Sequence, residues 1–253
     1  MSKQKVIIKN ETQIAGIKEA SRIAALTLDY IGQYVKVGIT TEELDHICNA
    51  FIMQNGGKSA CIGYHQYPKY TCISINDTIC HGIPSKSEVL KDGDIVNIDV
   101  TVFKAGYFGD TSRMYTVGNV SKTALKLIEV TKKALEIGIS QVFPGNYTSN
   151  IGYEISKYVE KLGYSVVREY TGHGIGLQFH EEPYIYHKAQ KNNGTIMAPG
   201  MIFTIEPMIN IGDHRTKLLK DGWTVKTSDG NLSAQFEHTI LVTEDGYEIL
   251  TLA

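Results

Sequence analysis

Cysteine and long hydrophobic runs are scarce in this sequence of 253 residues. Its four cysteines, Cys48, Cys61, Cys72 and Cys80, show no C-x-x-C spacing and are too few for a disulfide framework in a chain of this length. No stretch approaches the run of about 18 apolar residues that a membrane-spanning helix needs. The basic N-terminus leads into no apolar run with a small-residue cleavage site. The sequence therefore predicts reduced thiols and a soluble, cytoplasmic protein with no membrane partner.

A large excess of charge of one sign is also missing. Lys and Arg number 25 and Asp and Glu number 27, which gives a formal net charge of -2. This balance argues against a chain that binds nucleic acid or a membrane surface through its overall charge, so any basic patch has to be local. A chain of this length can bury roughly three quarters of its unfolded surface, in one sizeable core or two smaller ones.

Two amphipathic helices are predicted near the start of the chain. Apolar residues in the segment 14–35 recur at spacings of three, four and seven, and this helix is expected to stop by Gly38. Thr40 stands three residues before Glu43 in the pattern of a capping box. That pattern predicts a second helix, which the pair Gly56-Gly57 ends.

A β-hairpin is expected after these helices. The segments 94–103 and 107–117 are rich in β-branched and aromatic residues, and Lys104-Ala-Gly106 lies between them. A turn at the first two of these three residues would place residues whose numbers sum to 209 opposite each other. This register predicts that Asp99 faces Asp110 on one side of the hairpin.

The second half of the chain repeats this plan. Thr148 begins an amphipathic segment that ends at Gly163, at an offset of 108 from the helix start at Thr40. The segment 91–99 aligns with the segment 198–206 at an offset of 107, with Gly and Ile residues in step. Because internal repeats determine architecture, the repeat indicates two related halves, each with helices and strands.

The repeat also aligns carboxylates. Asp99 falls on Glu206, and a second hairpin centred on the favoured turn dipeptide Asp221-Gly222 would place Glu206 opposite Glu237. Each half then offers two acidic residues from facing strands.

The four carboxylates carry a stronger signal together than singly. A single Asp or Glu in a strand is most often solvated. Asp99 and Glu206, however, lie inside apolar runs, where an unpaired carboxylate is costly to bury, and facing like charges repel. Divalent cations would remove both problems, and a pair of such ions can activate water. The carboxylates therefore predict a site for divalent cations.

Three histidines occur in loops marked by glycine or proline. His173 lies in Thr171-Gly-His-Gly-Ile-Gly176, which lacks the spacing of a dinucleotide-binding loop. His81 is followed by Gly-Ile-Pro, and His180 is followed by Glu-Glu-Pro rather than by the pattern of a zinc protease. These loops could ring one cleft, but the spacing alone leaves their convergence open.

Five motifs make the sequence similar to a known family. Asn97-Ile-Asp99, Gly109-Asp-Thr111, Thr171-Gly-His-Gly-Ile-Gly176, Thr204-Ile-Glu-Pro207 and Gln235-Phe-Glu-His-Thr239 occur in the order seen in methionine aminopeptidases. The similarity runs from the first helix to Leu250. It includes Cys72-Ile-Ser-Ile-Asn76 and His81-Gly-Ile-Pro84, with no motif missing. The sequence thus resembles the short bacterial form of the type I enzymes in the M24 metallopeptidase family.

The resemblance implies an α+β, pita-bread fold, in which two α/β halves form a curved antiparallel sheet with helices outside and the site inside. This agrees with the repeat found from the sequence alone. We expect one catalytic domain over residues 1–253, with halves at about 12–120 and 121–250.

The resemblance also implies a set of metal ligands, which are Asp99, Asp110, His173, Glu206 and Glu237. Asp110 and Glu237 would bridge two divalent ions about 3.5 to 4 Å apart, which hold a hydroxide for attack on the scissile carbonyl. Glu206 would handle the proton, His180 would hydrogen-bond the substrate carbonyl or the oxyanion, and His81 would contact the leaving peptide or its amide nitrogen. Such ligands accept cobalt, manganese, iron or zinc.

A pocket for the methionine side chain is implied as well. By the resemblance it would consist of Cys61, Tyr64, Tyr67, Cys72, Phe179 and Trp223, together with His81 and His180. Thiols and aromatic rings suit a thioether, although an ordinary aromatic core would have the same composition. The implied activity is removal of the initiator methionine from nascent polypeptide N-termini when the second residue is small, by a chain expected to be a monomer.

Two further positions have alternative interpretations. Asn76 and Ser233 resemble residues near a monovalent-cation site in type I enzymes, but such side chains also cap loops. The loop 214–226 carries the basic residues Arg215, Lys217, Lys220 and Lys226. By the resemblance this loop would contact ribosomal RNA near the exit tunnel, and the alternative is a solvated surface loop.

Rival functions make different demands on the sequence. Prolidase and aminopeptidase P share such ligands but carry a large extra N-terminal domain, whereas the first helix here begins near Ile14. A partner-binding member of the fold without catalysis would be expected to lack ligands, and all five are present. The interval from Glu206 to Glu237 has no room for the helical insertion of type II enzymes, and the zinc-finger extension of eukaryotic cytosolic forms is absent.

Overall fold

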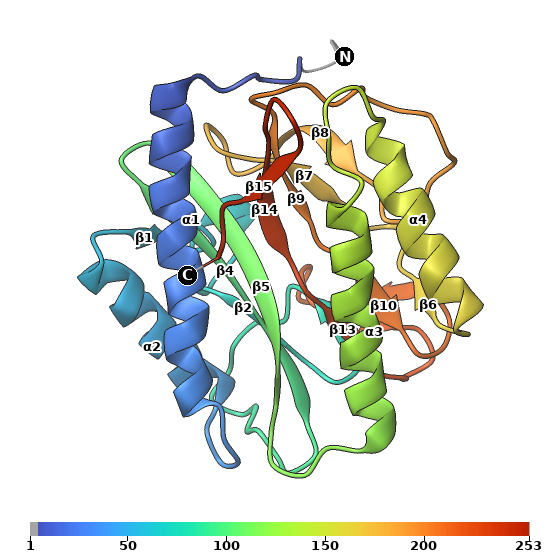
Figure 1. Ribbon diagram of the computed structural model, residues 1–253. Coiled ribbons are helices and arrows are strands. Elements are labelled where there is room, and N and C mark those ends of the chain that lie inside the picture. The colour runs from blue at the N-terminus through green and yellow to red at the C-terminus, as the bar shows by residue number, and fades with distance from the viewer. Residues whose placement is uncertain (1–4, 253) are drawn as a thin grey trace.

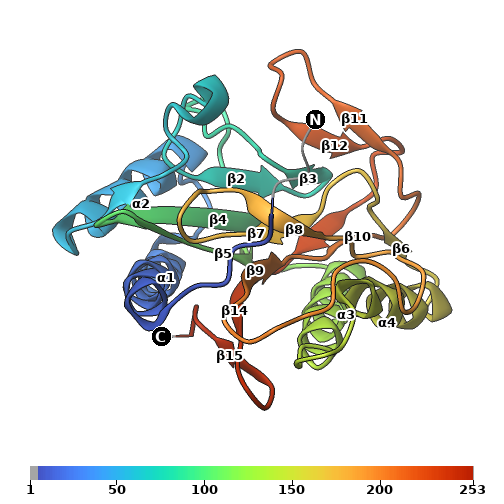
Figure 2. The same ribbon diagram turned by 90° about the horizontal axis from the view of Figure 1, so that it is seen from above.

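Two pairs of helices pack on antiparallel strands in the computed structural model, which describes residues 5–252 (Figure 1). Helices α1 (Glu11–Ile31) and α2 (Thr41–Gln54) pack on strands of the first half, and α3 (Lys122–Ile139) and α4 (Thr148–Lys161) pack on strands of the second half (Figure 2). No described helix is long and apolar enough to span a membrane. The expected α+β class is confirmed.

Capping boxes determine where the first two helices begin. The Asn10 side chain accepts the N–H of Gln13, and the Gln13 side chain accepts the N–H of Asn10, so α1 starts three residues before the predicted Ile14. Thr40 and Glu43 form the predicted capping box of α2. The α1 helix ends at Ile31 and continues as a single 3-10 turn, η1 (Gly32–Tyr34).

The strands pair antiparallel throughout the described chain. In chain order they are β1 (Lys58–Ser59), β2 (Cys72–Ile75), β3 (Thr78–Cys80), β4 (Ile95–Lys104), β5 (Tyr107–Thr116), β6 (Ser165–Val166), β7 (Gly172–Gly174), β8 (Glu181–Ile185), β9 (Ile202–Ile205), β10 (Met208–Asn210), β11 (Thr216–Leu218), β12 (Val225–Thr227), β13 (Ser233–Gln235), β14 (His238–Val242) and β15 (Tyr247–Ile249). In the first half, β4 pairs with β5 on one edge and with β1 and β2 on the other. In the second half, the order is β15-β14-β9-β7-β8.

The register predicted for the first hairpin is wrong by two residues. Asp99 pairs with Ser112 and Thr101 pairs with Asp110, so facing residue numbers sum to 211 rather than 209. The turn lies at Ala105-Gly106, where both residues have positive φ (49° and 93°), as a tight hairpin turn requires. Because a shift of two preserves the alternation of side chains, both carboxylates still lie on the same face.

The register of the second hairpin is confirmed. Thr204 pairs with Thr239, Met208 with Gln235, and Thr216 with Thr227, so every sum equals the 443 of Glu206 and Glu237. The turn lies at Asp221-Gly222, as predicted, and Gly222 has a φ of 80°. The hairpin is thus one long ladder, which is interrupted where Glu206 and Glu237 lie and again where β11 and β12 project (Figure 2).

The repeat of the two halves is visible in the backbone pairing. Isolated bridges join Thr40 to Val89 and Tyr147 to Ile196, each at an offset of 107. Each half also contributes most of one buried core. Leu28 and Ile98 belong to the first core and Leu127 and Phe203 to the second. The sequence-based expectation of two related halves is borne out.

Strands β5 and β14 meet at the seam between the halves. The Thr239 hydroxyl donates to the carbonyl of Asp110 at 2.7 Å, and the Thr111 hydroxyl donates to the carbonyl of Glu237 at 2.7 Å. The Glu237 N–H donates to the carbonyl of Ser112 at 3.1 Å. Asp110 from the first half and Glu237 from the second half are therefore each held at the seam, because their backbones form hydrogen bonds with the other half.

Candidate active site

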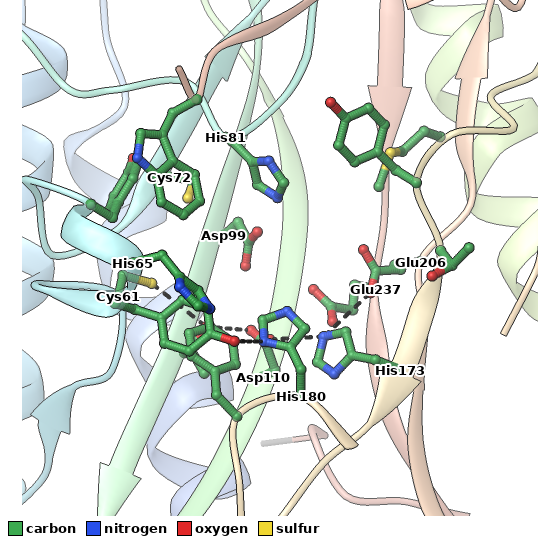
Figure 3. A pocket seen from close by; sticks show the side chains of 18 of the residues that line it. Cys61, His65, Cys72, His81, Asp99, Asp110, His173, His180, Glu206 and Glu237 are labelled. Atoms are coloured by element: carbon green, nitrogen blue, oxygen red, sulfur yellow. Dashed lines mark hydrogen bonds and ion pairs between the residues drawn. The ribbon is translucent and has the colours of Figure 1, made fainter. Parts of the chain in front are cut away.

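A cavity of about 390 Å³ lies over the seam (Figure 3). All the residues predicted to be metal ligands, to handle protons or to bind methionine line it, and these are Cys61, Tyr64, Tyr67, Cys72, His81, Asp99, Asp110, His173, Phe179, His180, Glu206, Trp223 and Glu237. The sequence left open whether the three loop histidines converge, and the fold brings them together.

Three of the acidic and imidazole groups are close enough to share one ion. Asp110 on β5, His173 on β7 and Glu237 between β13 and β14 each place one potential ligand atom within 4.8 Å of the others. The His173 Nε2 lies 3.8 Å from Asp110 Oδ2 and 3.7 Å from Glu206 Oε1. These separations are too long for hydrogen bonds, and they suit donor atoms that surround a common centre.

Hydrogen bonds hold Glu206 from several sides. The Thr204 hydroxyl donates to Oε1 at 2.8 Å, and the Gln235 side-chain amide donates to Oε2 at 3.1 Å. The Glu206 N–H donates to Nε2 of His187 at 3.0 Å, so this buried imidazole is neutral and positions the backbone. Glu206 is therefore fixed in orientation.

Asp110 is fixed in a similar way, while two other carboxylates keep free oxygens. The Thr101 hydroxyl donates to Asp110 Oδ1 at 2.8 Å. Asp99 Oδ1 and Glu237 Oε1 are buried and have no hydrogen-bond partner among the described residues. Since unpaired buried polar atoms are costly, these oxygens indicate a ligand that the protein itself does not supply.

Burial shifts the acidity of all four carboxyl groups in the metal-free protein. It raises the pKa of Asp99 to about 7 and that of Glu206 to about 8. It also raises the pKa of Asp110 and Glu237 well above the usual range, and neighbouring carboxylates raise both further. A cluster of this kind carries its full negative charge only when cations compensate it.

His173 presents the correct nitrogen to this cluster. Its Nδ1 lies 3.0 Å from the carbonyl of Gly174, and because a carbonyl only accepts, Nδ1 carries the proton. The Nε2 lone pair then faces the carboxylates. Burial lowers the pKa of His173 to about 4, so the ring is neutral near pH 7. The donor set fits hard or borderline divalent cations.

The other two loop histidines lie beside the carboxylates (Figure 3). His180 Nδ1 is 2.8 Å from the hydroxyl of Tyr64, and its ring centroid is 4.0 Å from that of His173. His81 contacts the rings of Tyr170 and Trp223 edge-on. Burial lowers the pKa of His180 to about 2 and that of His81 to about 4, so both rings are neutral donors or acceptors near pH 7.

The remaining wall of the cavity is apolar. Cys61, Tyr67 and Cys72 form a buried cluster against which Phe179 and Trp223 pack. Tyr67 is fixed because its hydroxyl donates to the carbonyls of Thr71 and Gly82. The wall combines thiols and aromatic rings directly beside the carboxylates.

Several cavity residues were not predicted from the sequence. Thr101 and Met208 lie two positions after Asp99 and Glu206, so strand alternation could have identified them. His65, Glu169, Tyr170, Thr171 and Tyr184 also line the cavity, and no local pattern marks them.

Asn76 and Ser233 lie next to each other, but neither residue lines the cavity. The Ser233 N–H donates to the carbonyl of Asn76 at 2.9 Å, and the Ser233 hydroxyl is buried without a partner. The Asn76 side chain donates to Asp94 and accepts the N–H of Ile95. Its side chain thus has the loop-fixing role that the sequence offered as the alternative.

The basic segment 214–226 forms the projecting β11–β12 hairpin (Figure 2). Arg215 pairs with Asp213, and Lys226 pairs with Asp77. Lys217 and Lys220 are exposed and form no ion pair within residues 5–252. Two of the four basic side chains are therefore compensated locally.

Comparison with known proteins extends these observations. The sequence model of metallopeptidase family M24 matches residues 15–244. The chain is 54% identical over 248 residues to the methionine aminopeptidase of Salmonella typhimurium, and the match covers 98% of this chain and 94% of that protein.

Solved structures agree with the sequence comparison. The methionine aminopeptidase of Rickettsia prowazekii is 50% identical and superimposes with a TM-score of 0.96, covering 98% of this chain and all of that one. The enzyme of Thermotoga maritima is 36% identical, with a TM-score of 0.97 over 98% of this chain and all of that one. The expected pita-bread fold is confirmed. The chain belongs to the methionine aminopeptidases of metallopeptidase family M24.

Proposed function

We propose that this chain hydrolyses the peptide bond after the N-terminal methionine of new polypeptides when the second residue is small. The observation that carries the proposal is the cavity itself, where a wall of four carboxylates and His173 directly faces an apolar wall of thiols and aromatic rings. The apolar wall suits a methionine side chain, and the polar wall is suited to hydrolysis. Membership of a metallopeptidase family makes a divalent metal cofactor part of this function.

The proposed ligands, which would hold two divalent ions, are Asp99, Asp110, His173, Glu206 and Glu237. The buried free oxygens of Asp99 and Glu237 and the neutral Nε2 of His173 support this assignment. Two divalent ions held there would polarise the scissile carbonyl and make a water molecule a better nucleophile. Cobalt, manganese, iron and zinc all fit such ligands.

The chain's own groups would handle the substrate and the protons. We assign the Tyr64 hydroxyl as the donor to His180 Nδ1, because a phenol is the stronger donor, and this leaves the Nε2–H of His180 free to donate to the substrate carbonyl. Glu206, which is held by Thr204 and Gln235, would move a proton from the attacking water to the leaving amide nitrogen. His81 lines the cavity and would contact the leaving peptide.

Methionine release from Met-Ala-Ser tests this function. Metal-stripped protein should be inactive, and cobalt or manganese should restore cleavage, because the carboxylate cluster alone provides no activated nucleophile. Ala-Pro-Ala serves as the control substrate. Cleavage of only the proline peptide would instead indicate aminopeptidase P activity, and cleavage of neither peptide would favour a protein that binds partners without catalysis.

We further propose that residues 1–253 act as one catalytic domain and as a monomer in the cytoplasm, with halves at about 12–120 and 121–250. All five proposed ligands come from one chain and from both halves, which supports this assignment. The pair Asn76 and Ser233 stays a candidate for a monovalent cation, supported by the unpartnered Ser233 hydroxyl.

The β11–β12 hairpin is proposed to contact the ribosome near the site where new chains emerge. Lys217 and Lys220 are exposed and uncompensated within the described residues, so they are available to phosphates. Replacing both by Glu should weaken co-sedimentation with ribosomes by about tenfold or more at low salt. Peptide cleavage should be unchanged, since neither side chain lines the cavity. Equal co-sedimentation of both proteins would contradict the contact.

A further inference from the structure

A buried ion pair joins the N-terminal segment to the strand that follows the His180 loop. Lys9, which precedes α1, places its ammonium 2.5 Å from Glu181 Oε2 on β8. The two side chains are 0% and 2% exposed. Every other Lys or Arg ion pair among residues 5–252 has at least one side chain that is more than a fifth exposed. Because burying two charges is costly, the presence of this buried pair needs an explanation.

Glu181 uses its second oxygen to hold the loop that precedes it. Its Oε1 accepts the N–H of Leu177 at 2.7 Å and the N–H of Gln178 at 2.8 Å. The Gly176 N–H closes the same turn on the carbonyl of Gln178. The carboxylate of Glu181 therefore fixes the turn 176–180.

That turn carries two side chains of the cavity. Phe179 packs against the methionine-pocket cluster, and His180 is hydrogen-bonded to Tyr64 and packed on the ring of His173 (Figure 3). The Phe179 and His180 rings also stack on each other, with their centroids 4.4 Å apart. A shift of the turn would move both side chains relative to the carboxylates.

Lys9 supplies the cationic partner of Glu181 in this buried position. A buried carboxylate that loses its cationic partner is costly to keep in place, so it turns toward water and is lost as an acceptor for the backbone amides of the turn. Lys9 is itself anchored, because its N–H donates to the carbonyl of Gly200 at 2.9 Å. Lys9 lies outside the region 15–244 that the family model matches.

We propose that Lys9 is a positioning residue for catalysis, which acts through Glu181 to hold the turn 176–180 so that His180 faces the substrate carbonyl and Phe179 faces the methionine side chain. The inference rests on the proposed peptidase function. Lys9 does not line the cavity, so its effect on catalysis has to pass through the turn.

Lys9→Met, which keeps the length of the side chain and removes its charge, tests the proposal in the metal-loaded protein. We expect kcat for Met-Ala-Ser to fall by about 10- to 100-fold and KM to change by less than about threefold, since His180 acts mainly as charge develops on the carbonyl. The amides of Leu177 and Gln178 should exchange hydrogen faster. Lys18→Met is the matched control, because the Lys18–Glu248 pair is exposed and should leave both readouts unchanged.

Two further variants separate a positioning role from a structural one. Lys9→Met/Glu181→Gln should recover most of kcat, because a neutral amide oxygen still accepts both N–H groups and no charge is left unpaired. In a His180→Ala background, Lys9→Met should lower kcat by less than about threefold, because both changes act on one unit. If Lys9→Met alone does not fold, Glu181→Gln and the double variant Lys9→Met/Glu181→Gln are measured instead.

The outcomes distinguish this inference from the proposed function. Lys9→Met with unchanged kcat and unchanged exchange of the turn, and only a lower melting temperature, would overturn the positioning role. A wild-type protein that does not cleave Met-Ala-Ser would refute the proposed function instead. The exchange measurement still reports on the Lys9–Glu181 contact in that case, because it requires no activity.

Discussion

Replacing His173 by alanine should lower kcat/KM for a methionyl peptide by more than about 100-fold while the protein stays folded. The neutral Nε2 of His173 lies 3.8 Å from an oxygen of Asp110 and 3.7 Å from an oxygen of Glu206, and among the described residues no other nitrogen belongs to the group of close ligand atoms. Loss of a directly coordinating group should exceed the 10- to 100-fold that outer-sphere changes typically cost. Steady-state kinetics at saturating manganese or cobalt, together with circular dichroism, provide the measurement.

A matched control and a second variant sharpen this prediction. His46→Ala removes an exposed histidine that does not line the cavity and should behave as the parent protein. Asp110→Asn should be as inactive as His173→Ala. In the metal-free state it should nevertheless melt at a higher temperature than the parent, because one of several mutually repelling buried carboxyl groups is gone. Substantial activity in His173→Ala would refute the ligand assignment.

The metal-free protein should lose roughly 5 to 10 °C of melting temperature between pH 6.5 and 8.5. In the folded chain the pKa values of Asp99 and Glu206 are about 7 and about 8, above the ordinary 3.8 and 4.5. The folded state then binds more protons than the unfolded state, so the free energy of unfolding falls as the pH rises through these values. This contribution is complete below pH 4 and is lost by about pH 8.5.

Below pH 6.5, buried histidines oppose the effect of the carboxyl groups on stability. Buried His81, His173 and His180 have lowered pKa values, so below pH 6.5 the unfolded state binds more protons at these residues and stability rises with pH. Above pH 6.5 the carboxyl groups dominate. With saturating divalent metal the decline should disappear, because the ligands are then deprotonated throughout. Thermal scans with and without chelator measure both states, and a flat or rising curve for the metal-free protein would contradict the prediction.

Strand alternation explains why the carboxylate site could be predicted from the sequence. Asp99 and Asp110 lie on one face in any register that differs by an even number of residues. A turn misplaced by one residue shifts the pairing by two, so this error left the site intact. The turn was misplaced because Ala105, which is not a typical left-handed residue, has a φ of 49°. In the second half, Asp221-Gly222 is a standard turn dipeptide, and the register was correct.

The convergence of the histidine loops depended on information that local patterns do not contain. His81 and His180 are brought into the cavity by loops whose paths depend on tertiary contacts. Their roles were assigned through the family resemblance and not from spacing. The buried Lys9–Glu181 pair was missed for the same reason, since nothing within the segment 5–10 marks Lys9 as buried. Such contacts join positions that are 172 residues apart in the sequence.

The seam between the halves also makes the site dependent on completed folding. Asp99 and Asp110 belong to the first half, whereas His173, Glu206 and Glu237 belong to the second half, and Asp110 and Glu237 are held by contacts across β5 and β14. A partly folded chain with only one half ordered presents an incomplete set of the proposed ligands, and we expect it to hydrolyse no peptides. We therefore expect hydrolytic activity only after the two halves have docked, because neither half alone presents all five proposed ligands.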